Sequence, residues 1–295
     1  MKNNSYQKIL NFSKSSGVSV KQILDFLFSK NDKSLAKSIV DDIKKEKFEN
    51  SNLTFKNFKF QDYFFEFLKD ENFKNSYLVL QKYQKYFPKP NRKLDQFLAK
   101  PQTVAKRASL LNFLNDLESK KILFLGDDDF GSVASSKINN AEQVTVLDID
   151  NRILHSIKNI SNLEKLNIET FKYDVKFPLP DKFTKKYDVV FADPPYTPKG
   201  FNLFLSRAID ALDLRNNSAR IYICFGNSDR ARERFLPIYD ILQKSGLMIR
   251  FIFDKFNVYQ GADSIGNASS LFICDVTPKT KSLLKGKIND DIYTG

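Results

Sequence analysis

Between residues 119 and 278, short apolar segments alternate with helical patterns, and this alternation limits the folds open to the chain. The apolar segments are rich in Val, Ile, Leu and Phe and are too short for helices, which indicates buried strands. Strands that alternate with helices form parallel sheets covered by helices. The sequence therefore predicts an α/β fold with a doubly wound, mostly parallel sheet. Its strands are expected at 121–125, 143–147, 166–171, 187–192 and 219–225, and helices at 102–117, 202–212 and 230–242.

The chain is expected to fall into four parts. Prolines at 88, 90 and 101 bracket a polar segment that is typical of a connector. Before it, a helix pair followed by an alternating segment at 53–60 resembles a winged helix. The predicted parts are a winged-helix-like domain at 1–88, a connector and leading helix at 89–118, a Rossmann-like domain at 119–278 and a flexible C-terminal tail at 279–295.

The positive charge of the chain, +12 in total, is concentrated in its N-terminal third. Residues 1–110 contain 22 Lys and Arg against 11 Asp and Glu, whereas residues 111–280 contain 22 of each. A basic surface can bind nucleic acid. The candidate recognition helix offers Lys33, Lys37, Lys44 and Lys45 without a cluster of Arg, Asn or Gln suited to reading bases. We therefore expect a solvated docking or dimerisation face, with nucleic acid as a less favoured partner.

Several classes of protein are excluded by what the sequence lacks. The first ten residues have no apolar signal-peptide core, and no stretch approaches the roughly 18 apolar residues of a membrane helix. Cys224 and Cys274 lie fifty positions apart in apolar runs, and His155 is the sole histidine, on an amphipathic helix pattern. We expect a cytoplasmic protein with two reduced buried thiols, no metal site and no histidine chemistry.

The turn after the first strand, LFLGDDDFGS, is acidic where nucleotide-binding folds usually have a glycine-rich turn. Gly126 is followed by Asp127, Asp128 and Asp129. Three carboxylates repel a phosphate, or the carboxylate of S-adenosylmethionine, and attract a ligand that presents amines. The alternative is that one aspartate caps the next helix while the others are solvated. We favour a functional acidic turn.

The second and third strands each end close to an aspartate. Asp148 and Ile149 belong to VTVLDID, about 20 residues beyond the first turn, where an acidic side chain grips ribose hydroxyls in dinucleotide folds. Asp174 follows the third strand and is a candidate ligand for an adenine amino group. A helix cap is the alternative role for Asp174.

The fourth strand leads into FADPPYTPKG. Asp193 lies at the strand tip, Pro194 and Pro195 stiffen the loop, and Tyr196 follows. A carboxylate beside an aromatic face suits an amine that attacks a sulfonium, because the carboxylate takes or orients the amine proton and the ring attracts the cation. The alternative is a rigid turn with a capping aspartate. Four such residues together favour the functional interpretation.

These motifs resemble known families. DPPY after the fourth strand resembles amino-methyltransferases that modify exocyclic nitrogens of adenine or cytosine, or a glutamine amide. The longer combination of GDDD, VLDID, DPPYT and LFLSRAI resembles the branched-chain polyamine synthase family, the N(4)-bis(aminopropyl)spermidine synthases, over about residues 95–275. The resemblance implies a winged-helix-like domain before a methyltransferase-type Rossmann-like domain. It also implies transfer of an aminopropyl group from decarboxylated S-adenosylmethionine to spermidine, which releases methylthioadenosine.

The resemblance leads to a set of expected roles. Asp128 and Asp129 hold the aminopropyl amine or the acceptor, and one of them or Asp193 acts as base. Decarboxylated S-adenosylmethionine is a co-substrate, no metal takes part, and the partners are a polyamine and a second copy of the chain. A disordered terminus is expected at the C-terminal end, with a lid over a polycation, carrying Asp290, Asp291 and Tyr293, as the alternative.

Two other functions remain open. One is an S-adenosylmethionine-dependent amino-methyltransferase acting on nucleic acid, for which the basic N-terminal third would supply backbone affinity. The other is a polyamine-responsive DNA-binding regulator without turnover.

Overall fold

The computed structural model describes residues 68, 70–138, 141–226, 232–261 and 267–293. Residues 68–295 form a compact unit. The helix pair and the alternating segment that predict a winged helix, with their four lysines, lie outside the described residues.

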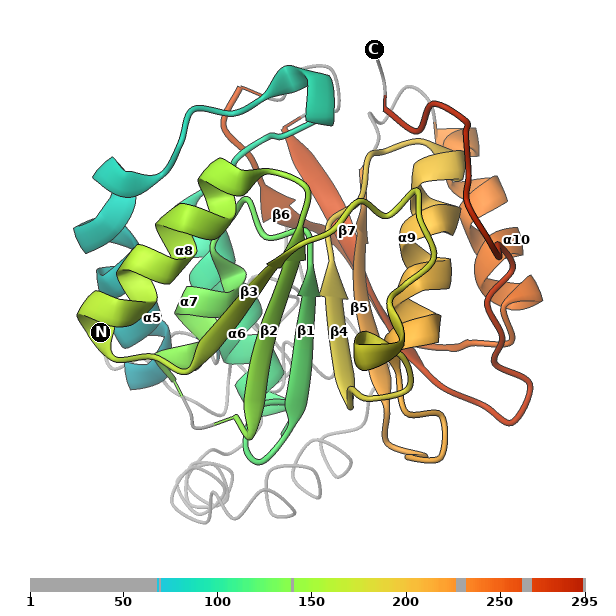
Figure 1. Cartoon of the computed structure of the whole chain (residues 1–295), viewed down its shortest axis with the longest axis horizontal. Coiled ribbons are helices and arrows are strands. Elements are labelled where there is room, and N and C mark those ends of the chain that lie inside the picture. Colours follow the sequence, from blue (N-terminus) through green and yellow to red (C-terminus); the bar gives the residue numbers. More distant parts are fainter. Residues whose placement is uncertain (1–67, 69, 139–140, 227–231, 262–266, 294–295) are drawn as a thin grey trace, which may run out of the picture. The chain divides into compact units, whose positions relative to one another are not determined.

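A seven-stranded sheet forms the centre of this unit, in the order β3-β2-β1-β4-β5-β7-β6 (Figure 1). The first five strands are parallel, and β7 runs antiparallel to both β5 and β6. The predicted doubly wound, mostly parallel sheet is therefore confirmed. The strands are β1 (Lys121–Leu125), β2 (Gln143–Asp148), β3 (Ile168–Lys172), β4 (Val189–Ala192), β5 (Arg220–Phe225), β6 (Met248–Val258) and β7 (Ala268–Asp275).

Helices cover both faces of the sheet, with α6, α7 and α8 on one side and α9 and α10 on the other (Figure 1). Their starts follow local chemistry: Asp150 caps α8 by accepting the N–H of Arg152, and Thr197 caps α9 before Pro198 in its first turn. The helices are α5 (Glu71–Tyr83), α6 (Pro101–Phe113), α7 (Gly131–Ser136), α8 (Asn151–Glu164), α9 (Pro198–Ala211) and α10 (Leu236–Lys244).

The last two strands, β6 and β7, which pair antiparallel with each other, were not predicted. Every residue of β7 after the first is buried, because the strand lies between β5 and β6. A buried strand has an apolar run without alternation, which periodicity cannot separate from a helix segment. Its neighbour β6 is an edge strand whose first five residues are exposed although most are apolar. Cys224 and Cys274 are buried free thiols, as expected.

The helix α5 falls within the predicted N-terminal domain but packs against α6 and α7. The Ser76 hydroxyl donates a hydrogen bond to the carbonyl of Ala134 in α7 over 2.8 Å. Lys82 and Tyr83 both donate to the carboxylate of Glu164 at the end of α8, over 2.6 and 2.7 Å. This helix therefore belongs to the α/β unit.

Residues 279–293 make defined contacts with the rest of the α/β unit, and the expected flexibility of the tail stays a prediction. Ile292 is 1% exposed, and its carbonyl accepts the Thr197 hydroxyl at 2.9 Å. Buried Arg207 of α9 donates to the carbonyl of Gly286 over 2.6 Å, and the Ile288 N–H donates to the Lys176 carbonyl over 2.8 Å. Backbone hydrogen bonds and apolar side chains both hold this segment, since Ile292 is buried and Leu283, Leu284, Ile288 and Tyr293 pack against the core.

Within the described parts of the chain, every helix is too short or too polar to cross a membrane.

Glu164 joins α5 and α7 to the end of α8, and its removal should change stability in a pH-dependent way. Hydrogen bonds from Lys137 and Lys82 lower the pKa of Glu164 to about 2. A glutamate whose pKa is lowered in the folded protein stabilises the fold at pH values above its unfolded pKa of about 4.3. This stabilisation is lost as the pH falls towards 2. Since Lys82 is largely exposed, we expect Glu164→Gln to lower the free energy of unfolding by about 1 kcal/mol at pH 7 and by less at pH 3. Urea unfolding at both pH values measures this.

The matched control is Glu118→Gln, the same change at an exposed side chain. Equal losses in the two variants, or an unchanged difference at pH 3, would contradict the assignment.

Candidate functional site

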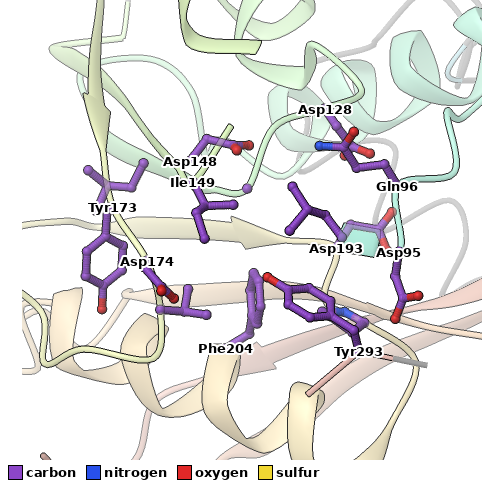
Figure 2. A pocket seen from close by; sticks show the side chains of 15 residues that line it. Asp95, Gln96, Asp128, Asp148, Ile149, Tyr173, Asp174, Asp193, Phe204 and Tyr293 are labelled. Carbon is purple, nitrogen blue, oxygen red and sulfur yellow. The ribbon is translucent and has the colours of Figure 1, made fainter. Parts of the chain in front are cut away.

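A pocket lies at the carboxyl ends of the parallel strands (Figure 2). Gly126 forms part of its wall directly after β1, and a φ of +75° makes glycine the suitable residue at this turn. The Gly126 N–H donates to the carbonyl of Leu147 at the end of β2 over 2.8 Å. The turn after β1 is thereby tied to the tip of its neighbour, which brings the predicted loops to one edge of the sheet.

The pocket is acidic. Five of the fifteen described residues that line it are aspartates, and none of the fifteen is Lys, Arg or His. Carboxylates without a cation beside them in the wall attract a positively charged ligand and repel an anion. The five are Asp95, Asp128, Asp148, Asp174 and Asp193.

The three consecutive aspartates have different surroundings, and only Asp128 lines the pocket. Asp127 accepts the N–H of Gly131 at 2.7 Å and the hydroxyl of Ser132 at 2.5 Å, so it binds the first turn of α7. Burial raises the pKa of Asp127 to about 8. This is the capping role that the sequence left open for one of the three, and ligand binding by Asp127 stays a prediction.

Asp129 also lies outside the pocket wall. Its carboxylate accepts the N–H of Ala99 at 2.5 Å and Nη1 of Arg107 at 2.7 Å. Burial raises the pKa of Asp129 to about 6, against the opposing effect of the Arg107 charge. Burial, together with the charges of Asp129 and Asp193, raises the pKa of Asp128 well above its usual range. The direct substrate contact expected of Asp129 stays a prediction, whereas Asp128 faces the ligand space.

Arg107 of α6 is the cation that joins these carboxylates. Its side chain is 3% exposed. Nη1 contacts Asp129, Nη2 donates to Oδ2 of Asp193 over 2.8 Å, and Nε donates to Oδ1 of Asn257 over 2.7 Å. The guanidinium carbon lies 5.2 Å from the ring centroid of Phe191 in β4. One buried positive charge is thus shared by two carboxylates.

Asp193 accepts hydrogen bonds from three side chains. Besides Arg107, the Tyr196 hydroxyl donates to its Oδ1 over 2.8 Å and the Tyr259 hydroxyl donates to its Oδ2 over 2.7 Å. Tyr196 itself is absent from the pocket lining, and its hydroxyl is bound to Asp193. The predicted contact of its ring with a cation stays a prediction. A Cβ at Gly226 would lie 2.6 Å from Cε2 of Tyr196, so glycine leaves room for this ring.

The loop that carries Asp193 contains the two prolines that the sequence predicts to stiffen it. Pro194 and Pro195 are both buried, and Pro195 contributes to the pocket wall.

Asp148, Ile149 and Asp174 line a second part of the pocket, beside Tyr173 and across from Asp128 and Asp193 (Figure 2). Asp148 accepts the N–H groups of Asp127 and Asp150 at 3.0 and 2.7 Å, and burial raises its pKa to about 6. The structure therefore brings together the predicted residues at the tips of β1, β2, β3 and β4.

Sequence reasoning missed several parts of the site. Arg107 was inside a predicted helix, and its signal was a charge on an apolar face that includes Val104 and Leu111. Tyr259 follows the unpredicted β6, and nothing local marked it. Asp95 and Gln96 lie in the segment taken for a connector. Tyr293, which the sequence offered only as part of an alternative lid, also lines the pocket.

Among the residues that the structure describes, no group of three His, Cys, Asp or Glu side chains is arranged to hold a metal ion.

Strand order and an acidic pocket at the strand tips define a methyltransferase-fold protein whose site suits cations. Two crystal structures of the branched-chain polyamine synthase from Thermus thermophilus, one of them the C9 mutein, superpose with TM-scores of 0.66 and 0.67. They are 23% identical in sequence and cover 74–75% of this chain and 68% of theirs. A candidate RNA methyltransferase from Pyrococcus horikoshii superposes with a TM-score of 0.55 at 18% identity, over 70% of this chain and 100% of its own. These likenesses establish the fold.

The family model for the branched-chain polyamine synthase A C-terminal domain matches residues 76–287. The chain belongs to the branched-chain polyamine synthase family. It is 36% identical to an uncharacterized protein of Methanocaldococcus jannaschii, over 77% of this chain and 56% of that protein. It is 32% identical to the N(4)-bis(aminopropyl)spermidine synthase of Thermococcus kodakarensis, over 58% of this chain and 49% of that enzyme. The chain thus spans about half the length of these curated relatives.

The pocket aspartates should make the ligand-free protein less stable at alkaline pH. A carboxyl whose folded pKa is raised stabilises the fold below its unfolded pKa of about 3.9, and this is lost as pH rises through the folded value. Asp128→Asn removes the charge that burial disfavours. We expect it to raise the Tm at pH 8 by about 2–4 °C, or about 1 kcal/mol, with a smaller gain at pH 4. Thermal unfolding followed by circular dichroism measures both.

Asp240→Asn is the control, since Asp240 is exposed on α10 and pairs only with Lys244 among the described residues. A lower Tm for Asp128→Asn at pH 8 would show that the Asp128 charge is already compensated.

Proposed function

We propose that this pocket transfers the aminopropyl group of decarboxylated S-adenosylmethionine to an amine of spermidine and releases methylthioadenosine. The observation that carries the proposal is the pocket wall, with five aspartates and no Lys, Arg or His among its fifteen described residues. Both substrates are cations whose ammonium groups need carboxylate partners. Such a wall is suited to both of them.

The two parts of the pocket match the two parts of the donor. Asp148 stands where an acidic side chain binds ribose hydroxyls, and Asp174 is available to an adenine amino group beside Tyr173. Asp128 and Asp193 face the other part, where the aminopropyl chain would lie (Figure 2). The donor's terminal ammonium then meets a carboxylate.

Ordinary S-adenosylmethionine fits this wall less well. Its methionyl group carries a carboxylate, which would approach Asp128 without a cation in the wall to compensate it. Like charges a few ångströms apart in a partly buried site repel strongly. Decarboxylation removes this charge and leaves the amine, so the pocket favours the decarboxylated donor.

The reaction requires an unprotonated acceptor nitrogen. Its lone pair forms a bond to the methylene next to sulfur, the carbon–sulfur bond breaks, and its electron pair stays on sulfur in methylthioadenosine. The new ammonium then loses a proton. Alignment of donor and acceptor contributes most of the rate, because no covalent intermediate is needed.

Asp128 is the best-placed residue to take that proton. Three side chains already donate hydrogen bonds to Asp193, and Asp129 is bound by Ala99 and Arg107. Burial and neighbouring negative charge raise the pKa of Asp128, which gives this carboxylate more affinity for a proton. We therefore assign Asp128 as base and Asp193 as the group that aligns the amine.

The relatives support this proposal. The Thermococcus kodakarensis relative is named N(4)-bis(aminopropyl)spermidine synthase. The Thermus thermophilus structures contain N4-aminopropylspermidine and 5'-methylthioadenosine. The first is an aminopropylated polyamine, and the second is the nucleoside that remains when the donor loses its aminopropyl group.

Donor choice tests the proposed reaction. The protein is incubated with spermidine and with either decarboxylated or ordinary S-adenosylmethionine, and nucleoside products are separated by chromatography. We expect methylthioadenosine from the decarboxylated donor and no S-adenosylhomocysteine from the ordinary one. S-adenosylhomocysteine alone, formed in the presence of nucleic acid, would indicate an amino-methyltransferase. Absence of product from either donor would leave a ligand-responsive regulator as the remaining interpretation.

Substitution of the two pocket carboxylates tests their roles. Asp128→Asn should lower kcat by about 10²- to 10⁴-fold because the base is lost, and Asp193→Asn should lower it similarly because the amine is no longer aligned. Steady-state kinetics with the decarboxylated donor measures this, with Asp240→Asn expected to match the wild type. Wild-type turnover in Asp128→Asn would remove its role as base.

A further inference from the structure

Two residues behind the pocket wall, Arg107 and Tyr259, hold Asp193 from its Oδ2 side. Arg107 Nη2 lies 2.8 Å from this oxygen and the Tyr259 hydroxyl lies 2.7 Å from it. The two donors also contact each other, with Nη2 of Arg107 donating to the Tyr259 hydroxyl over 3.0 Å. Both side chains are buried, and neither lines the pocket.

These two residues are themselves firmly placed. Arg107 Nε is bound to Asn257 Oδ1, and Nη1 is bound to Asp129. The Tyr259 hydroxyl contacts Oγ of Ser269 at 2.8 Å, and Asn257 Nδ2 donates to the same Oγ over 2.9 Å. A buried guanidinium with this many hydrogen bonds has little freedom to move, so the position of Asp193 Oδ2 is set by the domain core.

We propose that Arg107 and Tyr259 are positioning residues for aminopropyl transfer, acting through Asp193 without contacting either substrate. The inference rests on the proposed function. An amine attacks productively only when its nitrogen is aligned with the carbon–sulfur bond, and a misplacement of about 1 Å can lower the rate about 10²-fold. Release of Asp193 should therefore lower kcat while the nucleoside part of the pocket, at Asp148 and Asp174, stays intact.

Tyr259→Phe is the first test, because it removes one hydroxyl and keeps the ring. Its matched control is Tyr222→Phe, in which another buried tyrosine loses a hydroxyl bound to the carboxylate of Asp116, away from the pocket lining. We expect kcat to fall at least about tenfold in Tyr259→Phe and less than about threefold in Tyr222→Phe. The KM for the donor should change less than about threefold in both.

Arg107 needs a paired variant, since its loss alone leaves two buried carboxylates without their cation. Arg107→Gln with Asp129→Asn removes one positive and one negative charge together, and Asp129→Asn alone is its control. We expect kcat in the double variant to fall about 10²-fold below that of the control. Isothermal titration calorimetry with methylthioadenosine should give a Kd within about threefold of the wild type, because the nucleoside part is untouched.

The results separate two failures. If the wild type forms no methylthioadenosine, the proposed function fails. If the wild type turns over and Tyr259→Phe matches Tyr222→Phe, or the double variant matches its control, the positioning role is overturned. If kcat is unchanged and a higher donor KM or nucleoside Kd accounts for the whole loss of kcat/KM, the positioning role is also overturned, since a general structural defect would produce that pattern. Should the double variant not fold, Tyr259→Phe decides alone.

Discussion

A single buried positive charge organises the acidic end of this domain. Removing a charge from water is costly unless partners replace the water. The guanidinium of Arg107 has four such partners on three segments: Asp129 after β1, Asp193 after β4, and Asn257 and Tyr259 at the end of β6. Because each partner is also bound elsewhere, the cation fixes the loops relative to the sheet. Without it, the two carboxylates would repel each other in a region that water cannot screen. Arg107 thereby sets the position of Asp193 in the pocket wall.

The same electrostatics link stability and ligand choice. Arg107 compensates carboxylates behind the wall, whereas the wall itself presents aspartates with no cation among its lining residues. The raised pKa values of Asp128 and Asp148 record that cost, since burial and mutual repulsion oppose ionisation. A bound polycation supplies the missing charge. Binding of a cation would favour the ionised carboxylates and release protons, so the attraction of the pocket for cations and the energetic cost of burying its carboxylates have one origin.

The sequence predicted the sheet well because its information is local. The β1 segment was predicted with its observed bounds, and the tips of β1, β2, β3 and β4 identified the residues that meet at the pocket. The contacts that organise those residues are not local. Arg107 lies 150 positions from Asn257, and no short pattern joins them. Tyr293 lines the pocket at the end of a segment whose backbone is held by Arg207 and Thr197, both far away in the sequence. The sequence also does not show which of the three adjacent aspartates lines the pocket, because this depends on where α7 begins. In the structure Asp127 binds the first turn of α7, Asp129 binds Arg107 and Asp128 lines the pocket.

The turn after β1 shows how little must change for this sheet to accept an opposite charge. In nucleotide-binding sheets, glycines let backbone N–H groups approach an anion at the helix start. This chain keeps Gly126, whose left-handed conformation the turn requires. The N–H groups of Gly131 and Ser132 at the start of α7 are occupied by Asp127, and the N–H of Asp127 is occupied by Asp148. An anion would therefore find these donors already used and Asp128 in its way. The protein's own carboxylates stand where an anionic ligand would bind, and the neighbouring space is left to a cation.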